Sequence, residues 1–296
     1  MKMLLTGVSG FVGSRLLAAV CNRYGDKNVI ALSSKPVKLC EYILYNNDYS
    51  ISKHDVCKVK DVSLIIHAGA FTPKSRLDAD NILYCDSNIR FTEQLLTLMN
   101  GTKLQKIIYL STLDVYDDDG IISELTKLNP SSLYGMSKLY CEKMVTSFSH
   151  SRNIKSQILR IGHVYGPGEE KYQKLLPIAI SKILSDDEIE LWGDGSEIRS
   201  FIYITDVIEA CMAAIDLTEN VGVINIVSEQ SISIVSLLNK LAEILNTELK
   251  LISKPSSGEN KDYIFDSSKM KQVLLVSETP FDDGLKEEIT YFKGLQ

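Results

Sequence analysis

Tyr134 and Lys138 stand four residues apart in the segment Leu133-Tyr134-Gly135-Met136-Ser137-Lys138. On a helix, the side chains at positions i and i+4 share a face, so the ammonium can lie beside the phenol. A neighbouring positive charge favours the ionised phenol and lowers its pKa, which would make Tyr134 a usable acid or base near neutral pH. Tyr and Lys are common residues, so this spacing gains meaning only from the rest of the chain.

The amino terminus carries an apolar run that leads directly into three glycines, in Met3-Leu4-Leu5-Thr6-Gly7-Val8-Ser9-Gly10-Phe11-Val12-Gly13. Helical apolar spacing follows, so the order is strand, tight turn and helix. Glycine permits positive φ and close approach of a ligand, and the N-terminal end of a helix attracts a pyrophosphate. The spacing G-x-x-G-x-x-G differs from the G-x-G-x-x-G fingerprint. Its place after the first strand favours a dinucleotide site over a purely structural turn.

Apolar, β-rich runs alternate with helical patterns at residues 28–32, 42–45, 62–67, 106–111 and 154–161. Strands separated by helices predict an α/β fold with a Rossmann-type doubly wound parallel sheet. Ligands of such sheets bind at the carboxyl ends of the strands. The residues expected to converge there are Gly7, Ser33 to Lys35, His67 to Ala70, Ser111 with Thr112, and Gly162 with His163.

Composition restricts the class of protein. The chain has 296 residues, 45% of them hydrophobic, and a net charge of -6, which argues against a nucleic-acid or anionic-membrane partner. No segment approaches the length of a membrane span and the apolar start is too short for a signal peptide, so we expect a cytoplasmic protein. The six cysteines show no C-x-x-C pair, and we expect reduced thiols and no bound metal.

With these motifs together, the chain resembles the extended short-chain dehydrogenases/reductases, in the group of nucleotide-sugar epimerases, dehydratases and reductases. The resemblance rests on the glycine turn, on residues 67–70, on Ser111-Thr112-Leu113-Asp114-Val115-Tyr116, on Tyr134 with Lys138, and on residues 159–168 and 192–203. It implies a smaller C-terminal α/β substrate domain. The expected dinucleotide-binding domain covers 1–163 plus 201–228, and the expected substrate domain 164–200 plus 229–296.

The resemblance also implies roles for individual residues. Tyr134 would exchange a proton with a sugar oxygen that Thr112 holds, and Lys138 would bind the nicotinamide ribose and tune Tyr134. The implied cofactor-binding residues are Gly7, Gly10, Phe11, Val12, Gly13, Ser33, Ser34, Lys35, Asp48, His67, Ala68, Gly69, Ala70, Asn88, Ser111, Tyr134, Lys138 and Ile161. The implied substrate-binding residues are Thr72, Thr112, Asp114, His163, Arg199 and Lys261.

Within that set, Arg199 would clamp the diphosphate of a nucleotide sugar with its planar fork. The stretch from Lys254 to Lys261 resembles a family loop that closes over the nucleotide but lacks its usual arginine. Either Lys254 or Lys261 would then take its place. A homodimer through the helix that carries Tyr134 is implied by the resemblance alone.

The residue about 20 positions beyond the glycine turn indicates which cofactor is preferred, because an acid there binds the adenosine ribose of NAD. Position 33 carries a serine instead, in Leu32-Ser33-Ser34-Lys35-Pro36. Two hydroxyls and a lysine are suited to a ribose phosphate. The sequence therefore favours NADP(H) over NAD(H).

The residues after Thr112 bear on the reaction. Dehydratases of this group place an Asp-Glu pair there, whereas this chain has Leu113 and Asp114, which disfavours dehydration. The favoured hypothesis is reduction of a 4-keto sugar nucleotide. The alternative is an epimerase that works through a transient ketone. A 4,6-dehydratase and a catalytically silent NADP-binding sensor are disfavoured, the latter because a sensor has no chemical need for Thr112, Tyr134 and Lys138.

Overall fold

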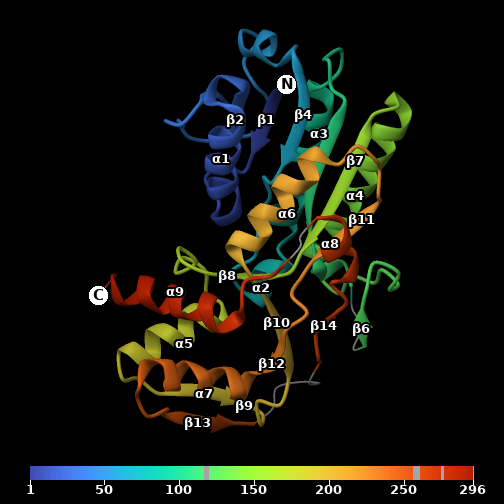
Figure 1. The fold of residues 1–296 in the computed structure, drawn as a ribbon. Coiled ribbons are helices and arrows are strands. Elements are labelled where there is room, and N and C mark those ends of the chain that lie inside the picture. The colour runs from blue at the N-terminus through green and yellow to red at the C-terminus, as the bar shows by residue number, and fades with distance from the viewer. Residues whose placement is uncertain (117–119, 256–260, 275–276, 296) are drawn as a thin grey trace. The chain divides into compact units, whose positions relative to one another are not determined.

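The computed structural model describes residues 1–116, 120–255, 261–274 and 277–295. The chain divides into two compact units (Figure 1). The first unit comprises Met1–Asp117, Lys127–Ile161 and Ile208–Asn225, and the second comprises Asp118–Thr126, Gly162–Val207 and Ile226–Gln296. The domain limits expected from the sequence stay a prediction.

The first unit is built on a sheet with the strand order β11-β7-β5-β4-β1-β2-β3. The strands are β1 (Lys2–Thr6), β2 (Val29–Ser33), β3 (Glu41–Leu44), β4 (Val62–His67), β5 (Lys106–Thr112), β7 (Lys155–Ile161) and β11 (Val223–Ile226). All pairings from β3 across to β7 are parallel. The order reverses at β1, between β2 and β4, which is where doubly wound sheets bind their ligands. The predicted fold class is confirmed.

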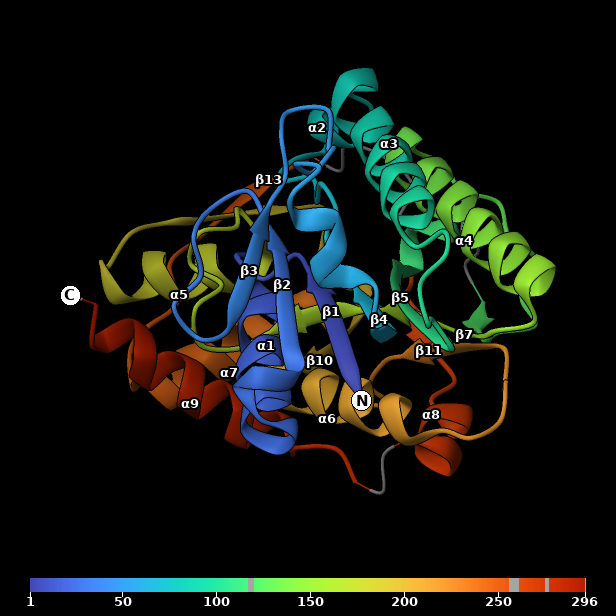
Figure 2. The ribbon, with the colours of Figure 1, turned by 90° about the horizontal axis from the view of Figure 1, so that it is seen from above.

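Helices cover both faces of this sheet because its strands are apolar on both sides. Figure 2 shows α3 (Ile82–Leu98) and α4 (Leu133–Arg152) side by side on one face, with α1 (Phe11–Tyr24) on the other. Short helical segments connect the strands: η1 (Asp26–Asn28), η2 (Asp55–Val59), α2 (Arg76–Ala79) and η3 (Leu113–Val115). The core under α3 and α4 includes Ile65, Phe91, Tyr109, Val145 and Ile158.

Local signals set the limits of α4, which carries Tyr134 and Lys138. Ser132 caps its start, accepting a hydrogen bond at 3.1 Å from the Gly135 amide. Asn153 ends it in the left-handed conformation, with φ of 54°. A Cβ at Gly135 would lie 2.2 Å from the carbonyl oxygen of Asp114, so only glycine lets the helix approach the segment after β5 this closely.

The second unit contains smaller sheets and its own helices. Strand β10 (Ile198–Tyr203) pairs with β8 (His163–Tyr165) and β12 (Ser231–Ser233), β9 (Ile189–Trp192) pairs with β13 (Leu251–Lys254), and β14 (Ile264–Phe265) pairs with β6 (Ile121–Ile122). Its helices are α5 (Leu175–Leu184), α7 (Ile234–Leu245), α8 (Ser268–Val273) and α9 (Phe281–Lys293). Helix α6 (Ile204–Asp216) runs from the second unit into the first.

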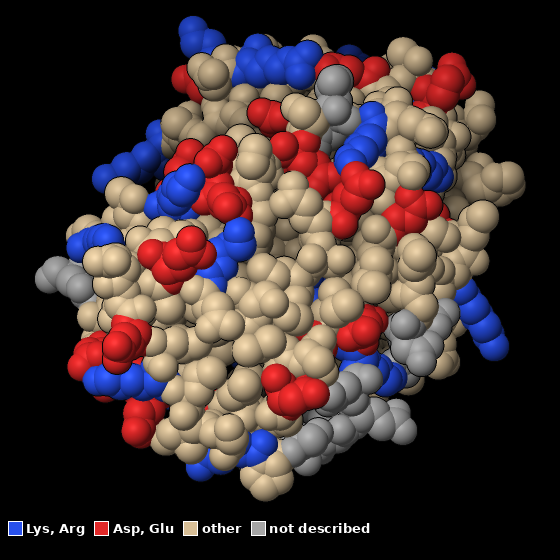
Figure 3. All heavy atoms as spheres, turned by 60° about the horizontal axis from the view of Figure 1, so that its bottom comes forward, with Lys and Arg blue, Asp and Glu red and all other residues tan. Residues whose placement is uncertain are grey.

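Charged side chains of both signs are interspersed on the face drawn in Figure 3. Among the described helices, we find none that combines the length and apolar character needed to cross a bilayer.

Candidate active site

The glycine turn after β1 is packed so tightly that side chains are excluded. Gly7 has φ of +73°, and a Cβ on it would lie 2.5 Å from the Ala68 carbonyl. A Cβ on Gly13 would lie 2.1 Å from the Gly7 oxygen, and one on Gly69 would lie 2.5 Å from the Phe91 ring. The turn and the segment after β4 therefore meet backbone to backbone.

The start of α1 fits an anionic ligand. Gly10 is its N-cap and supplies no side-chain hydrogen bond, and the described first turn contains no acidic residue. Amide groups at an uncapped helix start, together with the positive end of the helix dipole, are suited to a pyrophosphate. Predicted ligands Phe11, Val12 and Gly13 form this first turn.

His67, a predicted cofactor ligand, is 1% exposed, and its ring is held by two hydroxyls. Thr6 Oγ1 lies 2.7 Å from Nδ1, and Thr92 Oγ1 lies 3.1 Å from Nε2. Thr6 accepts from the Gly69 amide at 2.9 Å, and Thr92 donates to the Asn88 carbonyl at 2.8 Å. Because the Thr92 hydroxyl hydrogen goes to Asn88, Nε2–H donates to Thr92, and in a neutral imidazole Nδ1 then accepts from the Thr6 hydroxyl.

The electrostatics of His67 agree with that assignment. Burial, helped by the charge of Lys138, lowers the pKa of His67 to about 3. The side chain therefore holds the Gly69 segment in place through Thr6, and its assignment as a cofactor ligand stays a prediction. Thr92, which completes the chain of hydrogen bonds, carried no signal in the sequence.

Asn88 is also buried and joins two parts of the site. Its Oδ1 accepts from the Phe71 amide at 2.7 Å, and its Nδ2 donates to Ser137 Oγ at 3.1 Å. Ser137 in turn donates to the Tyr134 carbonyl at 2.8 Å. Asn88 thus fixes the segment leading to the exposed Thr72 against the first turns of α4.

The end of β2 presents a polar turn. Ser33 is 4% exposed, and its Oγ accepts from the Lys35 amide at 3.2 Å, whereas Ser34 and Lys35 are exposed. Asp48 is exposed too, and hydrogen bonds from Ser50 lower its pKa. Ser34 and Lys35 are therefore better placed than the Ser33 hydroxyl to meet a cofactor phosphate.

Thr112, Tyr134 and Lys138 are buried together, with 8%, 6% and 2% exposure. Thr112 ends β5, and its hydroxyl donates to Oδ2 of the exposed Asp114 at 2.9 Å. Burial and the Asp114 charge raise the pKa of Tyr134, against a smaller opposing effect of hydrogen bonds with Thr112 and Thr72.

The net shift of the Tyr134 pKa is upward, and the tuning of Tyr134 by Lys138 stays a prediction. The Lys138 Nζ donates to the Leu110 carbonyl at 2.7 Å and lies 4.3 Å from the centre of the Tyr109 ring. Burial lowers the pKa of Lys138 to about 8, against the opposing influence of Cys141 and Glu142. Because its own pKa is raised, Tyr134 is held in its protonated form.

Ser111, another predicted cofactor ligand, has a buried Oγ with no hydrogen-bond partner among the described residues. An unsatisfied buried hydroxyl is costly, and a ligand at the end of β5 would remove that cost. Ile161, at the end of β7, is half-buried. The fit of a dinucleotide to the first unit rests on this hydroxyl and on the uncapped start of α1.

Three predicted substrate ligands gather within the second unit, around an unpredicted tyrosine. The Arg199 guanidinium lies over the Tyr263 ring, 5.1 Å from its centre, and the centre of the His163 ring lies 6.0 Å from it with the two rings nearly perpendicular. Arg199 Nη1 donates to the Lys261 carbonyl at 2.6 Å. Glu197 makes a longer ion pair with the guanidinium, with 3.6 Å between Glu197 Oε2 and Arg199 Nη2.

The loop expected to close over a nucleotide is described only at its ends, because residues 256–260 lie outside the described residues. Lys254 makes an ion pair with Glu190 at 3.4 Å. Lys261 is held against Arg199 through its backbone. The sequence had no signal for Tyr263 because an isolated tyrosine shows no spacing that suggests a ligand contact.

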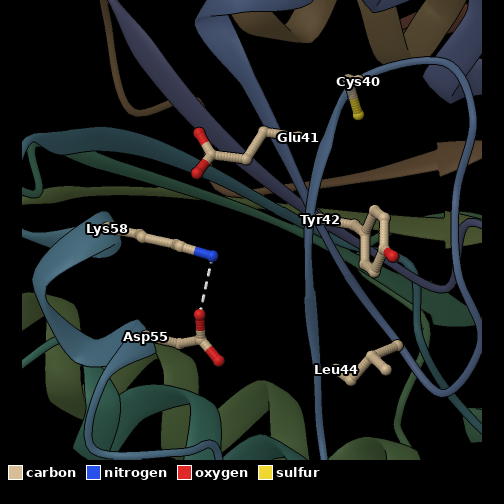
Figure 4. A pocket seen from close by; sticks show the side chains of 6 residues that line it. All are labelled: Cys40, Glu41, Tyr42, Leu44, Asp55 and Lys58. Atoms are coloured by element: carbon tan, nitrogen blue, oxygen red, sulfur yellow. Dashed lines mark ion pairs between the residues drawn. The ribbon is translucent and has the colours of Figure 1, made fainter.

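A separate hollow of about 430 Å³ lies beside the edge strand β3 (Figure 4). Cys40, Glu41, Tyr42, Leu44, Asp55 and Lys58 line it. Lys58 is paired with Asp55 at 2.7 Å. Glu41 is paired with Lys2, which lies outside this lining. None of the predicted site residues lines this hollow and its charged groups have partners, so the chemistry points to the ends of β1, β4 and β5 instead.

Known proteins resemble the chain over its whole length. An uncharacterized UDP-glucose epimerase of Bacillus subtilis is 29% identical, with 100% of this chain and 99% of the relative covered. A dTDP-D-glucose 4,6-dehydratase of Homo sapiens is 24% identical over 99% of this chain and 90% of its own. The crystal structure of a UDP-glucuronic acid 4-epimerase from Bacillus cereus, in complex with UDP-glucuronic acid and NAD, is 28% identical with a TM-score of 0.86, and both chains are covered completely.

The model of the NAD dependent epimerase/dehydratase family matches residues 3–227, which include the glycine turn, Thr112, Tyr134 and Lys138. That match extends over most of the chain, and it agrees with the sheet order and with the resemblance inferred from the motifs. The protein is therefore an enzyme of the NAD dependent epimerase/dehydratase family.

Proposed function

We propose that the protein is a 4-epimerase of a UDP-sugar, which inverts a ring hydroxyl through a transient ketone. The observation that carries the proposal is the buried group of Thr112, Tyr134 and Lys138 in a chain whose relatives at 28% and 29% identity are named as sugar-nucleotide epimerases. Those names favour epimerisation, the alternative in the sequence-based hypothesis, over reduction of a 4-keto sugar.

The residues of the first unit suit that chemistry. The nicotinamide cofactor, when bound, supplies the acceptor and donor of hydride. Tyr134 takes the proton of the sugar hydroxyl and later returns it, while Thr112 holds the oxygen by a hydrogen bond. A raised pKa at Tyr134 favours return of the proton, and the ammonium of Lys138 favours its removal. The proton that Tyr134 removes in the first step is returned in the second, so there is no net gain or loss of protons, as epimerisation requires.

The segment after Thr112 supports epimerisation over dehydration. Loss of water from a hexose needs an acid to protonate the leaving hydroxyl. Position 113 carries a leucine that is 8% exposed and packs into the protein, so it offers no such group. Asp114 is the one carboxylate that the described segment 112–116 contributes, and its partner is Thr112.

The cofactor is a nicotinamide dinucleotide, and we propose NADP(H) as the preferred form on the basis of the β2 end. Exposed Ser34 and Lys35 offer a hydroxyl and a cation to a ribose phosphate. The Bacillus cereus enzyme was solved with NAD, which makes this preference a specific point to test.

The second unit supplies the residues proposed to bind the nucleotide diphosphate. Arg199 is partly exposed, and the Lys261 carbonyl and the Tyr263 ring orient it. Little side-chain conformational entropy is therefore lost when a ligand binds. A planar guanidinium makes two parallel hydrogen bonds to phosphate oxygens. We propose His163 and Lys261 as further contacts of the same ligand.

A homodimer through α3 and α4 is also proposed. Apolar side chains on these helices are exposed, among them Ile82, Leu83, Met136 and Tyr140. Exposed apolar side chains on two paired helices would suit an interface with a second copy of the chain. Sedimentation of the purified protein would give the mass of the particle, and a monomer at working concentration would contradict this assignment.

The decisive experiment incubates the purified protein with UDP-glucose and UDP-glucuronic acid and follows the 4-epimers by NMR. Epimers should accumulate to an equilibrium mixture without net change in the absorbance of the reduced nicotinamide. Tyr134→Phe is the matched control and should form none. If a 4-keto sugar nucleotide is instead reduced with stoichiometric consumption of NADPH, the protein is a reductase and the epimerase proposal fails.

A further inference from the structure

A buried ion pair lies one helical turn beyond Lys138. Glu142 on α4 and Arg160 on β7 are joined by two hydrogen bonds, Nε to Oε1 at 2.9 Å and Nη2 to Oε2 at 2.7 Å. Their side chains are 5% and 3% exposed. Such a pair repays its desolvation only with good geometry, and apolar replacements are often no less stable. Stability alone therefore gives a weak reason for its presence.

The pair belongs to a wider network that reaches the other catalytic segment. Arg160 Nη1 donates to Tyr116 Oη at 2.6 Å, and the guanidinium lies 4.9 Å from the Tyr116 ring. Tyr116 in turn donates to Asn225 on β11 at 3.0 Å. Tyr116 directly follows η3, whose N-cap is Thr112. One network thus ties α4, β7 and the segment carrying Thr112 together.

The surroundings of Lys138 show what the carboxylate contributes. From the sheet, Tyr109 on β5 and the neutral His67 on β4 face the ammonium, and the Leu110 carbonyl accepts its hydrogen bond. From α4 itself, Cys141 and Glu142 act on it. Glu142 is the carboxylate among these described groups. Its charge opposes the burial that drives the pKa of Lys138 down.

We infer that Glu142 and Arg160 are positioning residues of the active site. The pair fixes α4 on the sheet with Tyr134 and Lys138 in place, and the Glu142 carboxylate, one helical turn from Lys138, favours the charged form of the Lys138 ammonium. This inference deepens the proposed function and rests on it for its effect on turnover, although the charge of Lys138 is measurable without any substrate.

The first test follows Lys138 itself. Protein carrying ¹³C-labelled lysine is titrated by NMR, and Lys138→Arg assigns the resonance. Glu142→Gln removes the charge at nearly constant volume, so the titration of Lys138 should move to lower pH by about one unit. Glu142→Asp, which is shorter but charged, should restore most of the shift. An unchanged midpoint in Glu142→Gln overturns the charge-keeping role.

The second test is the pH profile of epimerisation. If turnover needs the charged ammonium, the alkaline limb of kcat should move to lower pH in Glu142→Gln, with roughly tenfold lower kcat above the new midpoint. Tyr116→Phe is the matched control. It removes the hydroxyl that accepts from Arg160 and donates to Asn225 but leaves the Glu142 charge in place, so it should lower thermal stability and leave the alkaline limb where it is.

The outcomes separate the two proposals. A shifted Lys138 titration with no epimerisation of any tested sugar supports the role of Glu142 and contradicts the proposed function. A uniform loss of kcat at all pH values, in proportion to lost thermal stability and with an unshifted titration, makes the pair merely structural. If Glu142→Gln does not fold, Glu142→Gln/Arg160→Gln removes both charges and leaves no unpaired buried ion. A smaller shift to lower pH is then expected, because the opposing positive charge of Arg160 is lost as well.

Discussion

The Lys138 ammonium donates its hydrogen bond to the main-chain carbonyl of Leu110, at 2.7 Å, although it lies one helical turn from the Tyr134 phenol. Helix α4 and strand β5 thus meet through a charged side chain, and the carbonyl is one residue from Ser111. The lysine is anchored by the protein's own main chain. Its effect on Tyr134 is therefore expected to depend on ligand binding, because burial and the Asp114 charge hold the tyrosine protonated.

Tyr134→Phe should abolish epimerisation. The change removes the proton donor and acceptor and almost no volume, so kcat should fall by roughly two to four orders of magnitude. Cofactor affinity and thermal stability should hardly change. Steady-state kinetics and a cofactor titration on the same preparation check both parts, and activity within a few-fold of the parent would show that another group handles the proton.

Arg199→Ala should lower kcat/KM by about two orders of magnitude, on the scale of a lost charged hydrogen-bond pair. Part of the loss should fall on kcat, because a remote diphosphate contact also holds the sugar in place. Arg199→Lys should recover only some of it, since a point charge cannot replace the fork. Kinetics of all three proteins provide the measurement, and normal substrate binding in both variants would exclude the clamp.

Lys35→Glu should weaken NADP(H) binding without harm to the fold, because Lys35 is exposed at the end of β2. A charge-assisted hydrogen bond to a phosphate contributes about 1.5 to 3 kcal/mol, so the affinity for NADP(H) should fall by about 10- to 150-fold. Affinity for NAD(H) should change little. Calorimetric titration of both cofactors measures the ratio, and tighter binding of NAD(H) by the parent would refute the preference for NADP(H).

Gly13→Ala should prevent cofactor binding. The added Cβ would lie 2.1 Å from the Gly7 oxygen, so the turn or the helix start must shift. Gly120→Ala is the control, because a Cβ there meets no described atom within 4 Å. Cofactor titration and thermal unfolding of the two variants should differ sharply, and a Gly13→Ala protein that binds cofactor like the parent would contradict the close packing.

Glu288→Gln should make the protein more resistant to alkaline pH. Glu288 and Glu169 are 0% and 1% exposed, and Lys174 Nζ lies 3.8 Å from Glu169 Oε2. Burial and the neighbouring carboxyl raise the pKa of Glu288 from 4.5 to about 10. The folded protein keeps a proton that the unfolded chain releases, so the free energy of unfolding falls as pH rises from 4.5 toward 10.

Glutamine keeps the hydrogen-bonding capacity of Glu288 and cannot ionise. The free energy of unfolding of the variant should therefore fall much less as the pH rises. Thermal unfolding at pH 6 and pH 9 measures it, with the parent losing more stability between the two than the variant. Glu243→Gln on an exposed position of α7 is the control and should follow the parent. Equal losses of stability in the parent and in Glu288→Gln would show that the folded protein keeps no proton on the pair formed by Glu288 and Glu169.

Much of the fold and part of the candidate site followed from the sequence alone. Local patterns determined the strands of the parallel sheet, since apolar runs, glycine turns and helical spacing are properties of short segments. Strand β4 has the predicted limits, and β2, β3, β5 and β7 differ by a residue or so at their ends. The positions of Gly7, Ser33 and Thr112 at strand ends followed from the same patterns.

Only the tertiary structure decided which groups the side chains contact. The sequence placed Lys138 on the face of Tyr134, but burial raises the pKa of Tyr134 and lowers that of Lys138. The hydrogen bond of Lys138 goes to the Leu110 carbonyl. His67 became a neutral link between Thr6 and Thr92, residues 61 and 25 positions away. Tyr263 and Glu142 likewise contact side chains from distant parts of the sequence, Arg199 and Arg160. Hydrogen bonds and charges act through space over a few ångströms, and sequence spacing reports that proximity only within a single element.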